Sequence, residues 1–224
     1  MRLVALAAFA LSATQAAADP VVVELFTSQG CSSCPPADAM LGQLTERRDV
    51  LPLSLHVDYW DWIGWPDTFA VPAHAERQRG YAAGVGSSVL YTPQFVVGGS
   101  GIVAGAKGMA LADTVQAHLA APREVLEIEG DTLVMQAAGQ PAELVMVEVE
   151  PLRRVAVPRG ENAGRELVYH NIVRAWTPMG SWDGAAGRRA LPPASEPDRM
   201  RVVLAQRMGA DGRPGAILGA AADR

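Results

Sequence analysis

The two cysteines of this chain, Cys31 and Cys34, lie at the junction between an apolar run and a helical pattern. They are the only cysteines in 224 residues, and the apolar run at residues 21–26 precedes them. Two thiols three positions apart at a helix start can form one small disulfide, and the helix dipole favours the thiolate of the first. The pattern therefore predicts redox chemistry at this pair.

A stabilising role for the pair is weakly supported. A disulfide between these residues closes almost no loop and constrains the unfolded chain very little. A scaffold held by disulfides would carry several pairs spread along the chain. Two interpretations stay open: a pair that cycles between dithiol and disulfide, and an inert pair that is permanently oxidised.

The first half of the chain predicts alternating strands and helices. Pro35 and Pro36 suit the first turn of a helix, whose apolar positions continue to Leu44. Residues 51–57 alternate apolar and polar side chains, as a strand buried on one face does. A helix over residues 72–83, a hairpin turning at Gly98 and Gly99, and a last helix over residues 109–119 follow.

From residue 124 onward the pattern changes to short β-like runs. They cover residues 125–129, 132–136, 144–149, 165–176 and 201–206. The predicted fold class is α/β, a thioredoxin-like βαβαββα domain with a β-rich, sandwich-like C-terminal appendage. The predicted division is a signal peptide at 1–18, the thioredoxin-like domain at 19–122 and the β-rich region at 123–224.

The first eighteen residues have the pattern of a secretory signal. A basic end at Arg2, an apolar centre and the small residues 16–18 precede Asp19, where the mature chain would begin. We expect an exported protein, periplasmic or extracellular, with no membrane span after signal removal. The net charge of −5 and the lack of a basic cluster argue against nucleic acid as a partner.

Three motifs carry a resemblance to a known family. They are residues 24–38 around the cysteines, residues 56–60, and residues 91–94. Residues 21–121 resemble the thioredoxin-like superfamily. The whole chain resembles a family of exported bacterial thioredoxin-like proteins catalogued as a domain of unknown function.

The resemblance implies roles for four residues. Cys31 would be the exposed attacking thiol, Cys34 the resolving thiol, and Pro93 a cis-proline whose loop, with Thr92, faces the disulfide and binds an extended substrate. Many thioredoxins have a buried acid six residues before the first cysteine, where this chain has Leu25. Glu24, one residue earlier, is expected on the other sheet face, which leaves a proton relay without its usual acid.

An aromatic loop follows the second strand and contains Trp60, Trp62 and Trp65. Its position at the end of a parallel strand makes it a candidate substrate-binding wall, because ligands often bind at that edge of an α/β sheet. The alternative is a small apolar core that covers the sheet edge. Nearby Asp58, Asp61 and Asp67 are expected to hold the loop through turn hydrogen bonds.

The function that these features predict is an exported thiol:disulfide oxidoreductase. Its partners would be client proteins or small thiols and an unidentified redox partner, and it would need no cofactor. One alternative is a non-catalytic envelope binding protein on a thioredoxin-like scaffold. A further alternative is a copper-handling protein, since thiolates bind such ions, but the sequence has no second cysteine pair and predicts no metal site.

Overall fold

The computed structural model describes residues 19–121, 123 and 125–223. The predicted signal peptide at 1–18 lies outside the described residues, as do residue 122, the predicted end of the first unit, and residue 224. None of the helices within the described ranges has the length and apolar character needed to cross a membrane.

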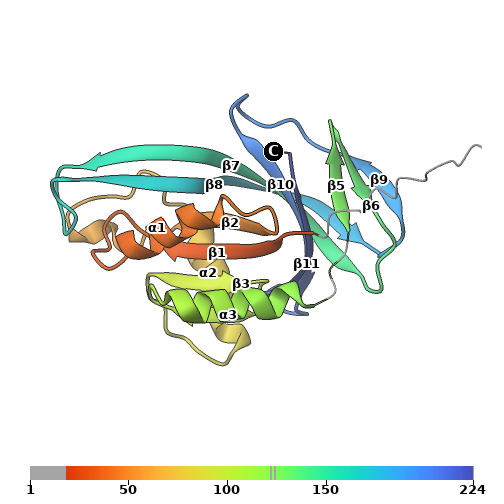
Figure 1. Cartoon of the computed structure of the whole chain (residues 1–224), viewed down its shortest axis with the longest axis horizontal. Helices are drawn as coiled ribbons and strands as arrows, with labels where there is room; N and C mark the ends of the chain where they lie inside the picture. The colour runs from red at the N-terminus through yellow and green to blue at the C-terminus, as the bar shows by residue number, and fades with distance from the viewer. Residues whose placement is uncertain (1–18, 122, 124, 224) are drawn as a thin grey trace, which may run out of the picture.

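The largest element is an eight-stranded sheet in the order β11-β10-β7-β8-β2-β1-β3-β4 (Figure 1). Its strands are β1 (Val21–Thr27), β2 (Val50–His56), β3 (Gln94–Val97), β4 (Gly101–Ala104), β7 (Ala142–Val157), β8 (Arg165–Trp182), β10 (Met200–Met208) and β11 (Pro214–Ala222). β1 pairs with β2 in parallel and with β3 antiparallel. β8 pairs in parallel with β2, so strands from both halves of the chain share one sheet.

A second sheet contains β5 (Leu126–Glu129), β6 (Thr132–Met135) and β9 (Gly187–Ala190). It packs on the main sheet through an apolar cluster that includes Leu133, Met146 and Val203. The molecule is therefore mixed α/β, as predicted, but richer in β structure. The expected sandwich-like appendage differs from the structure, because β7, β8, β10 and β11 continue the main sheet, and β5, β6 and β9 pack across it.

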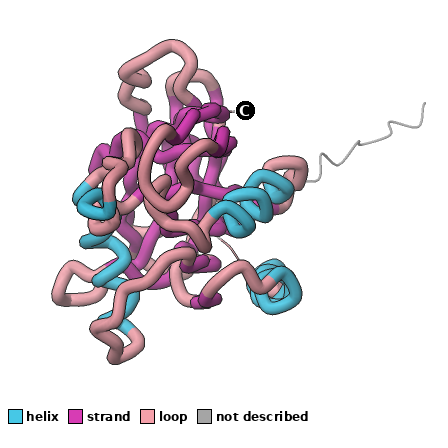
Figure 2. The backbone as a smooth tube through the Cα atoms, turned by 90° about the vertical axis from the view of Figure 1, so that its left-hand side faces the viewer, coloured by secondary structure: helices cyan, strands magenta, loops and turns pink. Residues whose placement is uncertain are grey.

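The helices lie close to their predicted positions, at α1 (Pro35–Leu44), α2 (Pro72–Gly84) and α3 (Gly108–Leu119). Leu41 of α1 and Leu111 of α3 pack with Leu25 on one face of β1. Tyr81 of α2 packs with Phe26 on the other face. A view from the end where α1 begins shows the strands at the centre of the molecule, with helices on more than one side of them (Figure 2).

Strand β2 was predicted to be buried on one face, and this is wrong. All seven of its residues are buried, because β2 lies between β1 and β8 and both of its faces are covered. Ser54 and His56, at the polar positions of the alternation, are completely buried. The structure thus places an ionisable side chain inside the protein at a polar position of the alternation.

The main sheet curls until β11 meets the turn between β3 and β4. The amide of Ile217 donates a hydrogen bond to the carbonyl of Gly98 at 2.9 Å. Asp19, at the start of the described chain, accepts hydrogen bonds from the amides of Leu126 and Ala220. The two halves of the chain therefore enclose a common core.

Candidate functional site

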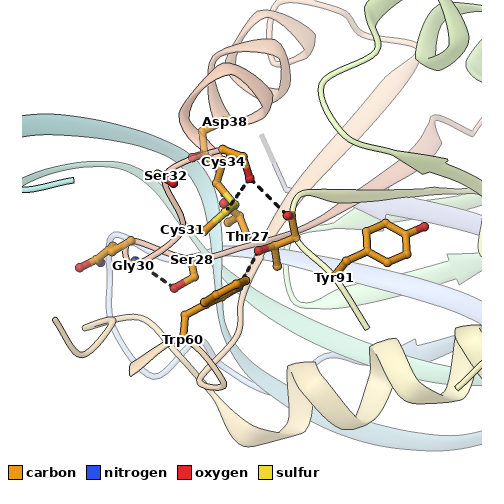
Figure 3. Close-up of a disulfide and its surroundings, with 12 residues drawn as sticks. Thr27, Ser28, Gly30, Cys31, Ser32, Cys34, Asp38, Trp60 and Tyr91 are labelled. Atoms are coloured by element: carbon orange, nitrogen blue, oxygen red, sulfur yellow. Dashed lines mark hydrogen bonds between the residues drawn. A yellow bond between two sulfur atoms is a disulfide. The ribbon is translucent and has the colours of Figure 1, made fainter. Parts of the chain in front are cut away.

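A disulfide joins Cys31 and Cys34 in the segment between β1 and α1 (Figure 3). Cys34 is the N-cap residue of α1. The residue expected to be the exposed thiol is covered, since only 2% of Cys31 is exposed and Cys34 is completely buried. Ser32 and Ser33, between the cysteines, are exposed.

Few groups of the described structure are placed to stabilise a thiolate at Cys31, although the sequence predicts support from the start of the helix. The Ser33 hydroxyl lies 3.3 Å from the Cys31 sulfur, within hydrogen-bond distance. However, Pro35 and Pro36 have no N–H group, and the Cys34 amide donates to the Cys31 carbonyl. The first turn of α1 therefore offers little to the sulfur, and Ser33 supplies the direct contact.

The loop before β3 lies against the disulfide, as the close-up shows (Figure 3). The Thr92–Pro93 peptide bond is cis. The Ser33 hydroxyl is 3.5 Å from the Thr92 carbonyl oxygen, and the Trp60 indole donates to the Thr92 hydroxyl at 2.7 Å. The structure thus brings Cys31, Thr92 and Trp60 into one site, although they come from three separate segments.

The other two tryptophans of the aromatic loop point elsewhere. Trp65 donates to the side chain of Gln29 at 2.8 Å and packs against the apolar cluster around Phe69. Trp62 is 81% exposed, and its indole donates to the carbonyl of Tyr59. The three indoles therefore do not form one wall: Trp60 lies at the disulfide, Trp65 supports the loop behind it, and Trp62 faces solvent.

Asp67 and His56 form a buried pair close to the cysteine segment. Their side chains are completely buried, and His56 Nδ1 lies 2.7 Å from an Asp67 oxygen. Burial opposes ionisation of Asp67, but His56 and the amides of Gln29 and Phe69 hold its pKa below the ordinary value. Asp67 therefore ties His56 to the backbone just before Cys31, as a loop-holding role predicts.

Asp38, the last residue of the cysteine motif at 24–38, is a buried acid that the sequence pattern does not single out. It lies one helical turn after Cys34 and accepts a hydrogen bond from the Thr27 hydroxyl at 2.8 Å. Burial raises its pKa to about 7, against the lowering effects of His56 and Thr27. Its i+4 spacing from Cys34 was the signal that could have identified it.

The environment of Asp38 contains further unpaired polar atoms. Asp38 Oδ2, His56 Nε2 and the Tyr169 hydroxyl are all buried and have no hydrogen-bond partner among the described residues. The His56 and Tyr169 rings lie 4.6 Å apart, and burial together with the charges of Asp38 and Asp67 raises the pKa of Tyr169. Asp38 also lines a cleft of about 470 Å³ between α1 and β8, through which protons could exchange with solvent.

Glu24, a third buried acid, belongs to a different cluster from Asp38 and Asp67. Its carboxylate accepts hydrogen bonds from Arg77 and Tyr81 of α2, each at 2.5 Å. It lies on the α2 face of β1, opposite the face that Leu25 shares with α1, as strand alternation predicted. Within the described residues, no group of three or more histidine, cysteine, aspartate or glutamate side chains is placed to hold a metal ion.

Comparisons with known proteins identify relatives by sequence and by structure. A crystal structure of a protein from Agrobacterium tumefaciens is 33% identical, with a TM-score of 0.81, and the match covers 92% of this chain and 94% of that one. HBP35 of Porphyromonas gingivalis shares the fold at 14% identity, with a TM-score of 0.62 over 92% of this chain and 75% of its own. No curated protein matches the chain.

The sequence match agrees with the structural one. Residues 22–206 match a family model described as "Protein of unknown function (DUF1223)". The matched region runs from β1 into β10 and includes the disulfide, the Thr92 loop and Asp38. This chain is therefore a member of the DUF1223 family.

Proposed function

We propose that the protein is an exported thiol:disulfide oxidoreductase that uses Cys31 and Cys34 in a thioredoxin-like unit over residues 19–122. The single observation that carries the proposal is the Cys31–Cys34 disulfide at the start of α1, with the Ser33 hydroxyl at 3.3 Å from Cys31 and directed also to Thr92. The strand order β2-β1-β3-β4, with β1 and β2 parallel, supports the thioredoxin-like assignment.

The reaction that this site supports exchanges one disulfide for another. In the reducing direction, the Cys31 thiolate attacks a sulfur of a client disulfide, forms a mixed disulfide and releases one client thiolate. Cys34, as a thiolate, then attacks the Cys31 sulfur, forms the protein disulfide and releases the second client thiolate. Two electrons pass to the client, and the reverse sequence oxidises a client dithiol.

Asp38 is the side chain best suited to accept the proton of Cys34. Cys34 is completely buried and must lose its proton before it can attack. Asp38 lies one turn away, has one oxygen with no partner in the described part of the chain, and has a pKa of about 7. At neutral pH such a carboxyl group is divided between its two protonation states, which suits it to proton exchange.

The test is to trap the intermediate. The Cys34→Ala variant should form mixed disulfides through Cys31 with client proteins or small thiols, because it cannot resolve them. The matched Cys31→Ala variant should form far fewer, since Cys34 is completely buried. The absence of any mixed disulfide in the Cys34→Ala variant, after full reduction and exposure to glutathione disulfide, would refute the proposal.

The direction of electron flow is decided by the reduction potential of the pair. Equilibration with glutathione would give a potential of about −270 mV for a reductant and about −120 mV for an oxidant, by comparison with reference oxidoreductases.

Export is proposed from the pattern of residues 1–18. Fractionation of cells that express the full chain tests this proposal.

A second candidate is a non-catalytic binding protein, which the 2% exposure of Cys31 favours. A permanently oxidised, covered pair would take no part in chemistry, and the surface around Trp60 would bind its partner directly. Alkylation distinguishes the two candidates. A reactive Cys31 is labelled rapidly in the reduced, folded protein, whereas a covered and inert sulfur is labelled only after unfolding.

A further inference from the structure

The long β7–β8 hairpin reaches the cysteine segment from the other half of the chain. Its two strands run side by side along the sheet, and its tip, residues 158–164, lies at the end of the molecule where α1 begins (Figure 1). We call these residues the hairpin tip. The tip packs on the aromatic loop, since a Cβ added at Gly160 would lie 3.2 Å from Trp65 Cβ.

Asn162 of the tip binds the backbone immediately before and at Cys31. Its side chain is completely buried, and Nδ2 donates to the carbonyls of Gln29 and Cys31, each at 2.9 Å. Its oxygen accepts a hydrogen bond from Arg165 at 3.0 Å, which fixes the orientation of the amide. A residue 131 positions away thus determines where the Cys31 backbone lies.

Glu161 binds the backbone immediately after Cys31. Its carboxylate accepts a hydrogen bond from the Ser32 amide at 3.3 Å. Backbone amides after the first cysteine are the groups that would otherwise stabilise its thiolate, and Pro35 and Pro36 provide none. Glu161 therefore engages a scarce donor and places a carboxylate on the residue that follows Cys31.

We infer that the hairpin tip is a part of the redox site that holds Cys31 in place through Asn162 and disfavours its thiolate through Glu161. The inference rests on the proposed function. A less favourable thiolate destabilises the dithiol form relative to the disulfide, so Glu161 makes the pair more reducing. Both are positioning residues, because they act on Cys31 through its backbone and its electrostatic environment.

Other charged groups surround the segment and are kept unchanged in the test. Asp38 lies on α1, the His56–Asp67 pair lies behind the segment, Arg159 belongs to the tip, and Arg165 is the first residue of β8. Among the described residues only Glu161 is bonded to the Ser32 amide through a side chain. A substitution of Glu161 therefore isolates one charge.

The experiment compares Glu161→Gln with the wild-type protein, both fully reduced and then equilibrated with glutathione buffers. Glutamine keeps the shape and the acceptor but removes the charge. The equilibrium constant should shift roughly two- to fivefold toward the dithiol, as expected for one exposed charge, and the pKa of the Cys31 thiol should fall, as followed by thiolate absorbance. The shift should shrink in 1 M salt, where the Debye length is about 3 Å.

The matched control is Glu143→Gln, which removes an exposed carboxylate at the other end of the same hairpin and should leave the equilibrium unchanged. Asn162→Ala should increase the rate of Cys31 alkylation several-fold, because it releases both carbonyls. If Asn162→Ala does not fold, the Glu161→Gln result still decides the inference.

The outcomes distinguish a failure of the proposed function from a failure of the inference about the hairpin tip. A wild-type pair that never equilibrates with glutathione refutes the proposed function and the inference together. A wild-type pair that equilibrates, with Glu161→Gln unchanged or shifted toward the disulfide, overturns the inference alone. An equal shift in Glu143→Gln would also overturn it, because the effect would then belong to net charge.

Discussion

Thr27 donates its hydroxyl hydrogen to one oxygen of Asp38 at 2.8 Å, and the second Asp38 oxygen has no partner among the described residues. Only one of the two carboxyl oxygens of Asp38 thus has a hydrogen-bond partner in the described structure, and burial favours the neutral form of the group. The arrangement joins the end of β1 to α1 one turn after Cys34. It places a carboxyl group with a pKa of about 7 one helical turn after Cys34, the proposed resolving cysteine.

Asp38 should make the stability of the protein depend on pH. Burial raises its pKa from 3.8 to about 7, so the stability that its protonated form contributes is complete below pH 3.8 and is lost as pH rises through about 7. Asp38→Asn, which cannot ionise, should therefore gain stability over the wild type between pH 5 and pH 8, by at most about 3 kcal/mol. Urea unfolding at both pH values measures this. Asp113→Asn, an exposed position on α3, should show no such change.

Asp38→Asn should also slow the resolution of mixed disulfides. Without a carboxylate to accept the proton, Cys34 must ionise unaided, and the rate at pH 7 should fall by at least about tenfold. The rate of glutathione release from the Cys31 mixed disulfide should follow a group with a pKa of about 7 in the wild type and move to higher pH in the variant. Identical pH profiles for the two proteins would show that Asp38 takes no part.

The buried Glu24–Arg77 pair should matter more to stability than an exposed pair on the same helix. Glu24→Ala leaves the Arg77 guanidinium without its carboxylate in the core between α2 and the sheet, at a cost of about 3–5 kcal/mol. Glu76→Ala breaks the exposed pair with Arg79 and should cost less than about 1 kcal/mol. Chemical denaturation of both variants tests the difference, and equal costs would contradict a buried network.

The contact between the β3–β4 turn and β11 should depend on Gly99. A Cβ at this position would lie 2.2 Å from the Gly215 carbonyl oxygen, and its φ of 71° already disfavours other residues. Gly99→Ala should therefore cost at least about 3 kcal/mol. Gly130→Ala has a similar φ of 59° with no atom within 4 Å and should cost only about 1–2 kcal/mol. Thermal unfolding of the Gly99→Ala and Gly130→Ala variants distinguishes the cost of backbone strain, which both share, from the cost of the steric clash at Gly99.

Local patterns were sufficient for the elements of the first half of the chain. The apolar periodicity after Pro35 and the prolines themselves define α1, and glycines 98 and 99 define the hairpin turn. The same reasoning missed β9, which is charged and half exposed, and β11, whose alanines and glycines show no alternation. Both strands exist because neighbouring strands offer unpaired backbone groups, which no local pattern reports.

The candidate site likewise has features that the sequence predicted and features that it did not. The spacing of Cys31 and Cys34 predicted that the two can form a disulfide, and the motifs at residues 24–38, 56–60 and 91–94 indicated the Thr92 loop and the family of the protein. Only the tertiary structure decided that Cys31 is covered, that His56 is buried, and that Asn162 and Glu161 contact the cysteine segment. The physical reason is that periodicity reports which face of an element is apolar, whereas pairing of β8 with β2 and the reach of the β7–β8 hairpin depend on contacts more than a hundred residues apart.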